Sequence, residues 1–132
     1  MTDTKHVDTT ASVATERARK VLIVDDDDEI RHLLRVLFEL EGFDVVAEAA
    51  DGPNGVVLAM RHEPDFIVLD YRMPRMDGAQ TAHLLKVMTP GARIVAFSAI
   101  LTQKPEWADA FLDKERMAEV VPTLRVLAES FA

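Results

Sequence analysis

The sequence contains no cysteine and no long hydrophobic run, and both absences narrow the possible classes of protein. Without cysteine there is no disulfide framework, no thiolate zinc site and no cysteine nucleophile. No apolar run approaches the roughly 18–20 residues that a membrane-spanning helix needs, so we expect no membrane insertion. The opening Met-Thr-Asp-Thr-Lys-His is too polar for a signal peptide. These features predict a soluble, cytoplasmic protein.

Basic residues are also few, with 15 lysines and arginines against 23 aspartates and glutamates and a net charge of −8. This balance argues against direct binding of nucleic acid, which requires a basic face. An acidic excess can instead mark a cation site, so the positions of the acids matter more than their sum. The 132 residues, of which 48% are hydrophobic, are enough for one globular domain.

The chain divides into two parts of different pattern. Residues 1–19 are rich in threonine, alanine and serine and lack apolar periodicity. We expect this stretch to be a disordered N-terminal tail, with any helix confined to residues 14–18. Residues 20–132 have regular apolar patterns and are expected to form the folded domain.

Short apolar runs alternate with helical patterns throughout the second part. The runs predict five strands, at residues 21–24, 43–47, 66–69, 93–97 and 110–112. Helical periodicity predicts helices from residue 30 to a stop at Gly42, over 56–61, over 79–88, and up to 129 with Pro122 in the first turn or at a kink. This alternation is typical of an α/β fold with a parallel sheet and helices on both faces.

Polar residues follow the predicted strands at the edge where the carboxyl ends meet. They are Asp25 and Asp26 after the first strand, Asp70 after the third, Ser98 after the fourth and Lys114 beyond the fifth. Ligands of open α/β sheets bind at this edge. Three carboxylates there would repel each other unless a cation lay among them, and without histidine or cysteine the expected ion is Mg2+. With a lysine and a hydroxyl, they predict a phosphoryl site in which Asp70 is the nucleophile.

Four segments resemble the signature segments of response-regulator receiver domains. The acidic pair and the phosphoacceptor segment are matched by VLIVDDDDEI at residues 21–30 and FIVLDYRMPRMDG at residues 66–78. Residues 96–99 and 109–114 match the later segments in the family's order. The resemblance covers about residues 20–130, and the phosphoacceptor segment is its most specific part. It implies a flavodoxin-like, doubly wound five-stranded parallel sheet with strand order 2-1-3-4-5.

The resemblance implies a role for each residue around the acidic pair. Asp70 would be the phosphoacceptor, which takes a phosphoryl group from a phosphohistidine of a sensor histidine kinase or phosphotransfer protein. Asp26 would be a direct Mg2+ ligand, and Asp25 would act through water. Asp70 and the backbone carbonyl of Arg72 would complete the metal site.

The resemblance also implies a conformational switch. Ser98 would hydrogen-bond the new phosphoryl group and move toward it, and Lys114 would form an ion pair with it. Phe111 occupies the family's aromatic switch position and would turn inward when Ser98 moves. The alternative for Phe111 is a fixed place in the core.

Three features depart from the family pattern. Only 16 positions separate Ser98 from Lys114, so the fourth helix is expected to be short, irregular or absent. Glu115 stands where the family has proline, and Phe111 has no hydroxyl for a hydrogen-bonded switch. Trp107 lies in the shortened segment, where we expect it to fill the gap; the alternative is an anchor for a partner. The output surface is therefore expected to differ from the family's.

These features lead to one principal hypothesis and two alternatives. The principal one is a stand-alone receiver without an effector domain, which promotes only its own phosphorylation and dephosphorylation and acts through an unknown downstream protein or onward phosphotransfer. The first alternative is a receiver-like module that binds its partner regardless of phosphorylation. The second is a Mg2+-dependent hydrolase with Asp25 as nucleophile and Asp27 as acid. Otherwise we expect Asp27 and Asp28 to form a charged helix N-terminus.

Overall fold

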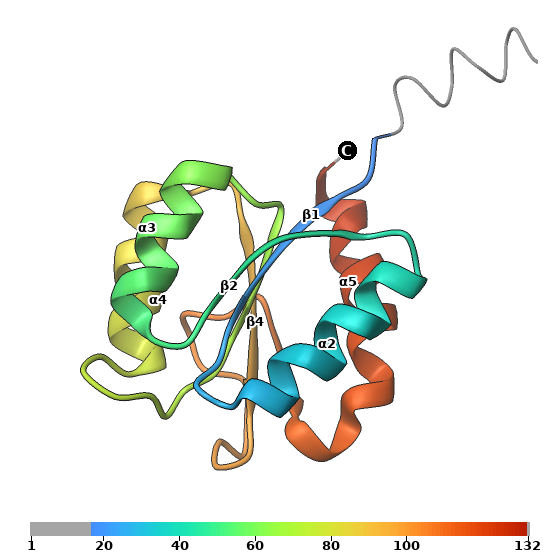
Figure 1. The fold of residues 1–132 in the computed structure, drawn as a ribbon. Helices are drawn as coiled ribbons and strands as arrows, with labels where there is room; N and C mark the ends of the chain where they lie inside the picture. The colour runs from blue at the N-terminus through green and yellow to red at the C-terminus, as the bar shows by residue number, and fades with distance from the viewer. Residues whose placement is uncertain (1–16, 132) are drawn as a thin grey trace, which may run out of the picture.

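A computed structural model describes residues 17–131, in which five parallel strands form one sheet (Figure 1). The strand order is β2-β1-β3-β4-β5, as the resemblance implied. The strands are β1 (Lys20–Val24), β2 (Asp44–Ala49), β3 (Phe66–Leu69), β4 (Arg93–Ser98) and β5 (Ala110–Asp113). All five predicted strands are confirmed, with small shifts of their ends.

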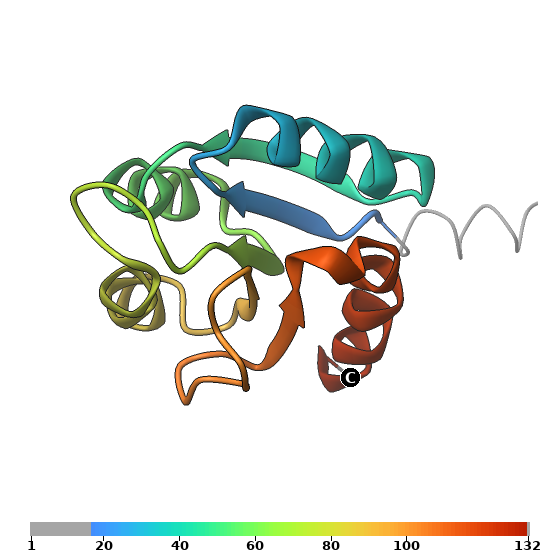
Figure 2. The same ribbon diagram turned by 90° about the horizontal axis from the view of Figure 1, so that it is seen from below.

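Within the described residues, α-helices cover both faces of the sheet (Figures 1 and 2). They are α2 (Asp28–Leu40), α3 (Gly52–His62), α4 (Gly78–Met88) and α5 (Val120–Ala128), with the short 3-10 helices η1 (Lys114–Glu119) and η2 (Glu129–Phe131). Helices α2 and α5 lie on one face, and α3 and α4 lie on the other. None of these helices is both long and apolar enough to cross a bilayer.

The core consists of two apolar layers, one on each face of the sheet. Val21 and Ile23 of β1 belong to the layer under α2 and α5, whereas Leu22 and Val24 belong to the layer under α3 and α4. All residues of β3 are buried as well. A strand covered on both faces needs apolar side chains in succession, which explains the continuous apolar runs in the sequence.

The acidic run after β1 starts α2. The Asp27 carboxylate accepts hydrogen bonds from the backbone N–H groups of Glu29 (2.9 Å) and Ile30 (3.2 Å) and so caps the helix. Asp28 is the first helical residue and is exposed. The helix N-terminal role expected for these two acids is confirmed. The cap uses one oxygen of the Asp27 carboxylate, Oδ1.

Helix α3 begins earlier than the sequence pattern predicts. The pattern placed a helix at residues 56–61 after a turn, but the helix starts at Gly52. Asp51 caps it by accepting a hydrogen bond from the backbone N–H of Asn54 at 2.9 Å. Pro53 lies in the first turn, where its missing N–H has no helical partner to lose. The Asp-Gly-Pro-Asn segment is therefore a helix start.

The segment between β4 and β5 contains no helix. None of the described residues 99–109 is helical, and in Figure 2 this segment (orange) runs as an open loop. Of the outcomes expected for the fourth helix (short, irregular or absent), the structure shows its absence, because the segment is too short to leave the sheet, form a helix and return. Trp107 packs, partly buried, against the apolar layer on the side of α3 and α4. This packing fits the expected gap-filling role, which stays a prediction beside the alternative of a partner anchor.

The C-terminal helix begins where the sequence predicts, whereas the N-terminal boundary is only partly within the described residues. Pro122 lies in the first turn of α5, which begins at Val120, in agreement with the prediction. At the other end, residues 17–19 have no regular structure, and β1 begins at Lys20. The rest of the predicted tail, with its possible helix at 14–18, lies largely outside the described residues. The division at residue 20 stays a prediction.

Candidate functional site

The carboxyl ends of the strands bring the predicted site residues to one edge of the sheet. Asp25 follows β1 and Asp70 follows β3, its neighbour in the sheet. The Asp25 N–H donates to the Ala49 carbonyl at 3.0 Å, and the Asp70 N–H donates to the Val24 carbonyl at 2.9 Å, so strand pairing fixes both backbones. A hollow of about 230 Å³ opens beside them, lined by Asp26, Asp70, Arg72, Ser98, Ala99, Ile100 and Lys114.

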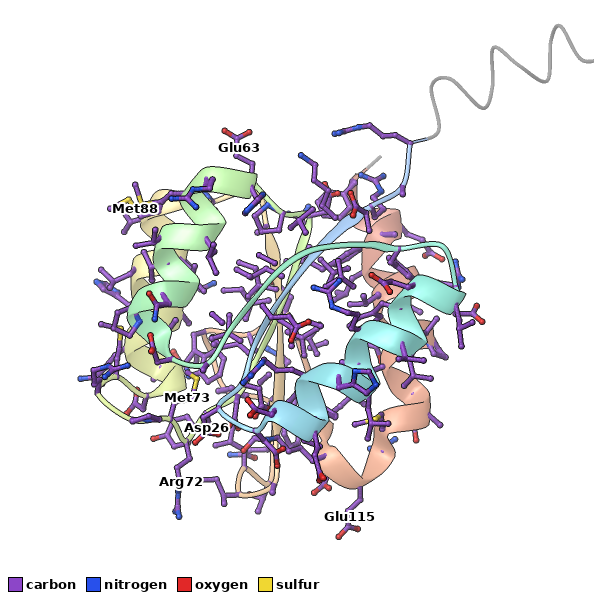
Figure 3. The ribbon with its side chains drawn as sticks, viewed as in Figure 1. Asp26, Glu63, Arg72, Met73, Met88 and Glu115 are labelled. Atoms are coloured by element: carbon purple, nitrogen blue, oxygen red, sulfur yellow. The ribbon has the colours of Figure 1, made fainter. Side chains whose placement is uncertain are left out.

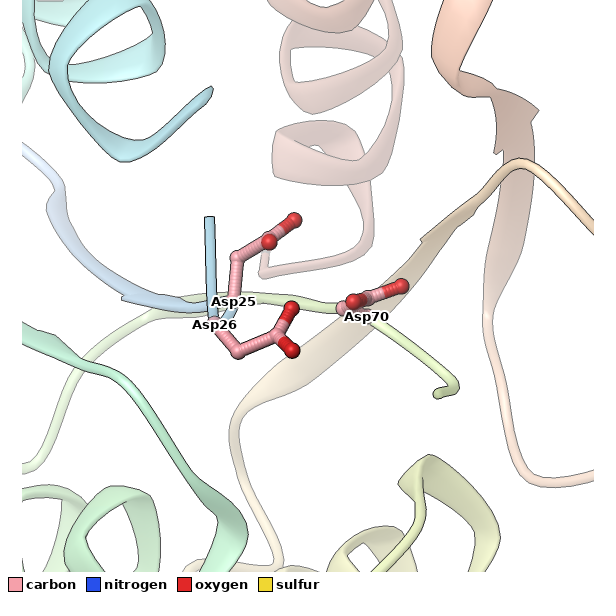
Figure 4. A group of neighbouring side chains, drawn as sticks. All are labelled: Asp25, Asp26 and Asp70. Carbon is pink, nitrogen blue, oxygen red and sulfur yellow. The ribbon is translucent and has the colours of Figure 1, made fainter. Parts of the chain in front are cut away.

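Asp25, Asp26 and Asp70 form an acidic cluster at this edge (Figure 4). One carboxylate oxygen of each lies within 4.8 Å of the others. Asp25 and Asp70 are only 2% and 5% exposed, whereas Asp26 is exposed. Two buried carboxylates and a third beside them repel one another, so the cluster favours a cation.

Lys114 brings a positive charge to the acidic cluster. Its Nζ lies 2.8 Å from Asp25 Oδ2 and 3.4 Å from Asp70 Oδ2. Burial alone would lower the pKa of the ammonium, but the carboxylates of Asp25 and Asp70 more than offset burial and raise it. Lys114 is therefore charged at neutral pH, and its single charge faces two buried carboxyl groups.

The carboxyl groups of Asp70 and Asp25 remain difficult to ionise in spite of the lysine. Burial and the negative charge of Asp25 raise the pKa of Asp70 to about 6, although Lys114 acts in the opposite direction. Burial likewise raises the pKa of Asp25 against the effect of Lys114. The acidic cluster therefore lacks positive charge that a bound cation could supply.

The donor atoms of the acidic cluster fit a hard divalent cation. Oδ2 of Asp25 is buried and accepts no hydrogen bond, having only the ion pair with Lys114. The cluster offers carboxylate oxygens alone, which Mg2+ prefers to nitrogen or sulfur. Mg2+ needs one or two carboxylates and keeps water in its other positions. The residues present therefore fit the cation expected from the sequence.

The loop after Asp70 is held close to the strand end by Gly78. Its N–H donates to the Tyr71 carbonyl at 2.6 Å. A side chain at this position would lie 2.7 Å from both the Asp70 backbone oxygen and Tyr71 Cα, so a Cβ cannot be accommodated without moving the backbone. This packing was missed from the sequence. The available signal was the Asp77-Gly78 pair directly before a helical pattern.

The side chains of Arg72 and Met73 diverge within the same loop (Figure 3). Met73 is buried in the apolar layer on the side of α3 and α4. Arg72 is exposed, and its side chain points away from the body of the protein. Arg72 is nevertheless one of the residues that line the hollow. The role of its backbone carbonyl as a metal ligand stays a prediction.

Ser98 ends β4 and is buried beside the hollow. Its Oγ accepts hydrogen bonds from the backbone N–H groups of Ile100 (3.1 Å) and Leu101 (3.4 Å). These contacts do not use the hydroxyl proton, which is free to be donated to a ligand.

Phe111 of β5 lies beside Ala96 of β4 in the sheet and is half-buried. Its inward movement stays a prediction.

Lys114 reaches the acidic cluster although Glu115 replaces the family's proline. The Asp113 carboxylate accepts a hydrogen bond from the Glu115 N–H at 2.8 Å and caps η1, which begins at Lys114. The Glu115 side chain is exposed and points away from the protein (Figure 3). The replacement therefore leaves the lysine facing the two carboxylates.

Comparison with known proteins decides the family. The sequence profile of the response regulator receiver domain matches residues 21–119 of the chain. The chain belongs to this family. A receiver domain with this strand order, and with an acidic cluster at the carboxyl edge, is consistent with a signalling role and with a phosphoacceptor site.

Individual relatives of this receiver domain come from several bacteria. The transcriptional regulatory protein PdtaR of Mycobacterium tuberculosis is 33% identical over 119 residues, which cover 86% of this chain and 58% of the relative. The chain thus spans little more than half of that protein. The receiver domain of the putative response regulator NarL, also from Mycobacterium tuberculosis, has a TM-score of 0.76 and 31% identity, covering 86% of this chain and 98% of that one.

A third relative is a solved complex. The CheX–CheY–BeF3–Mg2+ complex from Borrelia burgdorferi matches this receiver domain with a TM-score of 0.71 and 29% identity, over 84% of this chain and 92% of that one. Its description names Mg2+ and a protein partner, both of that complex.

Proposed function

We propose that this receiver domain is a signalling switch in which Asp70 accepts a phosphoryl group from a phosphohistidine of a sensor histidine kinase or phosphotransfer protein. The observation that carries the proposal is the place of Asp70. It is buried at the end of a central strand, its carboxylate lies 3.4 Å from the Lys114 ammonium, and it lines the hollow at the sheet edge.

Asp70 is a better nucleophile than the buried Asp25. Oδ1 of Asp25 accepts a hydrogen bond from the Asp27 N–H at 2.9 Å, and Oδ2 has the shorter contact with Lys114. Asp25 is also absent from the lining of the hollow, whereas Asp70 is part of it. An incoming phosphorus atom therefore meets Asp70 first.

Mg2+ would be held by Asp26 and Asp70 directly, by Asp25 through water, and by the backbone carbonyl of Arg72. When bound, it supplies positive charge to the phosphoryl oxygens and to the acidic cluster. The exposed Asp26 gives such a cation access from solvent. The description of the related CheX–CheY complex names Mg2+, which supports Mg2+ as the cation.

The transfer itself needs little more than position and charge. One oxygen of the Asp70 carboxylate attacks phosphorus, the bond from phosphorus to the donor histidine nitrogen breaks, and its electron pair stays on that nitrogen. Lys114 then pairs with the phosphoryl oxygens, and Ser98 donates its hydroxyl proton to one of them. Burial and Asp25 raise the pKa of Asp70 to about 6, and a cation at the acidic cluster would lower it and so favour the ionised, nucleophilic carboxylate.

The phosphoryl group then changes the shape of the surface beside the site. It adds roughly −1.5 to −2 charges and new acceptor oxygens. Ser98 moves toward it and lengthens its contacts with the Ile100 and Leu101 amides, and Phe111 turns inward. The output is binding of a downstream protein or onward phosphotransfer, without direct contact with nucleic acid.

The test is intact-mass measurement after incubation with Mg2+ and a small phosphodonor, acetyl phosphate or phosphoramidate. The wild type is expected to gain one phosphoryl group, and Asp70→Asn is expected to gain none. Removal of Mg2+ with a chelator should abolish the gain. A wild type that gains no mass, or a gain that persists in Asp70→Asn, contradicts the proposal.

A second function is favoured by one observation, the absence of helix in residues 99–109. A surface that differs from the family's at the segment after Ser98 suits a module that binds its partner without phosphorylation. Equal affinity of the partner for wild type and Asp70→Ala, with and without phosphodonor, selects this function. A change of affinity on phosphorylation of the wild type alone rejects it.

A further inference from the structure

A second ion pair lies at the same edge of the sheet, outside the acidic cluster. Arg75, in the loop after β3, contacts the carboxylate of Asp51, which follows β2. Asp51 is 4% exposed, and the same carboxylate accepts hydrogen bonds from the backbone N–H (2.9 Å) and the side-chain amide (3.0 Å) of Asn54. One buried carboxylate thus joins the start of α3 to the loop that begins at Asp70.

Asp51 is held in its charged form. The Asn54 backbone N–H and the Arg75 guanidinium lower the pKa of Asp51, more than burial raises it. A buried carboxylate needs a partner, because an unpaired charge is costly to remove from water. In the described part of the chain, Arg75 is the cationic side chain within ion-pair distance of Asp51.

The backbone of Arg75 adopts a conformation that a non-glycine residue rarely takes. Its φ is +70°, in the left-handed region, which side chains with a Cβ disfavour. The Met76 N–H donates to the Pro74 carbonyl at 2.8 Å, and the Gly78 N–H closes the base of the loop on Tyr71 at 2.6 Å. The loop is thus fixed at its base by a backbone bond and at its tip by a strained residue whose side chain binds Asp51.

The strand order places this contact beside the acidic cluster. The loop follows β3 and Asp51 follows β2, and these are the two strands that flank β1 in the sheet. Asp25 and Asp26 follow β1. The packing under the contact is close, since a Cβ on Gly52 would lie 2.2 Å from Thr81 Oγ1. Displacement of the loop tip therefore moves the loop rather than the helices beneath it.

We propose that Arg75, through Asp51, is a positioning residue that holds the loop of residues 71–77 so that the Arg72 carbonyl is presented to the cation at the acidic cluster. The inference rests on the proposed function. Arg75 is 66% exposed and far along the loop from Asp70, so it contacts no reacting atom. Its effect lies in the geometry of the loop.

The test compares Arg75→Ala, Arg75→Lys and Asp51→Asn with the control Arg125→Ala, which removes another exposed arginine paired to an acid, Glu41. Titration calorimetry with MgCl2 should show affinity about tenfold weaker for Arg75→Ala and for Asp51→Asn, partial recovery in Arg75→Lys, and no change in the control. The double variant Arg75→Ala/Asp51→Asn should bind Mg2+ no more weakly than either single variant. In Mg2+-free protein, hydrogen exchange of the 71–78 amides should accelerate in Arg75→Ala but not in the control.

Two results separate this inference from the proposed function. If Arg75→Ala binds Mg2+ as tightly as wild type with unchanged loop exchange, the positioning role is wrong even though wild type is phosphorylated by acetyl phosphate. If wild type takes no phosphoryl group, the proposed function fails, and the Mg2+ titration and amide exchange still decide the role of Arg75.

Discussion

The charge balance around Asp70 is the dominant feature at the scale of single residues. Two buried carboxyl groups share one lysine, and the pKa of Asp70 is raised to about 6 by burial and by Asp25. Two buried carboxylates with one lysine lower the stability of the folded protein and increase its affinity for a cation. We therefore expect the stability of the protein to respond to pH and to Mg2+ through these few groups.

Replacing Asp70 by asparagine should stabilise the Mg2+-free protein. Because the pKa of Asp70 rises on folding, its ionisation favours the unfolded state; the penalty develops from about pH 4 to about pH 6 and is complete above that range. Urea unfolding should show Asp70→Asn more stable by about 3 kcal/mol near pH 7.5, with little gain near pH 4. The exposed Asp44→Asn serves as control, and an equal gain at both pH values argues against this origin.

Replacing Lys114 should have the opposite effect. Lys114→Met leaves Asp25 and Asp70 buried without their cation, which should lower the free energy of unfolding of the Mg2+-free protein by roughly 2–4 kcal/mol. Added MgCl2 should restore part of the loss, as thermal unfolding with and without the ion would show. The exposed Lys86→Met should change neither value. A Lys114→Met protein as stable as wild type without Mg2+ would show that the lysine is not needed by the two acids.

At the scale of elements, the site is bordered by two loops, one after β3 and one between β4 and β5. The loop after β3 depends on a glycine whose backbone lies close to that of Asp70 and Tyr71. The loop between β4 and β5 is an irregular segment in place of a helix, and its Trp107 packs against the apolar layer on the side of α3 and α4. Both loops were only partly predictable. Apolar runs and caps are local signals, whereas a close approach of two backbones and the packing of a loop on the sheet are set by the tertiary fold.

Gly78→Ala should disturb the loop after Asp70. The new methyl group would lie 2.7 Å from the Asp70 carbonyl oxygen and from Tyr71 Cα, and both are backbone atoms that can move only with the loop. We expect slower phosphorylation by acetyl phosphate and a stability loss of about 1–3 kcal/mol. Gly91→Ala is the matched control, since nothing lies within 4 Å of its added Cβ. Equal phosphorylation rates in the two variants would contradict this reading of Gly78.

Trp107→Ala distinguishes the gap-filling role from that of a partner anchor. The indole is partly buried against the apolar layer on the side of α3 and α4, so its removal should lower the free energy of unfolding by about 2–3 kcal/mol. Trp107→Phe should lose less than half of that. Urea unfolding measures both variants. A Trp107→Ala protein as stable as wild type would favour the partner-anchor role.

At the scale of the whole molecule, the doubly wound topology makes a site from residues far apart in sequence. Asp25, Asp70 and Lys114 could be predicted to meet, because each closely follows a strand and parallel strands end at one edge. The Arg75–Asp51 contact could not, since Asp51 resembles a turn residue and Arg75 occupies an unremarkable loop position. Only the folded chain shows that α3 and the loop after β3 meet there.

The most direct test of Asp70 as the phosphoacceptor is to locate the phosphoryl group chemically. The protein is incubated with acetyl phosphate and Mg2+, the acyl phosphate is reduced with borohydride, and the digested peptides are sequenced by mass spectrometry. Reduction converts a phosphorylated aspartate to homoserine, and we predict homoserine at position 70 in wild type and at no position in Asp70→Asn. Homoserine at position 25 or 26 instead, or at no position in wild type, would contradict the account.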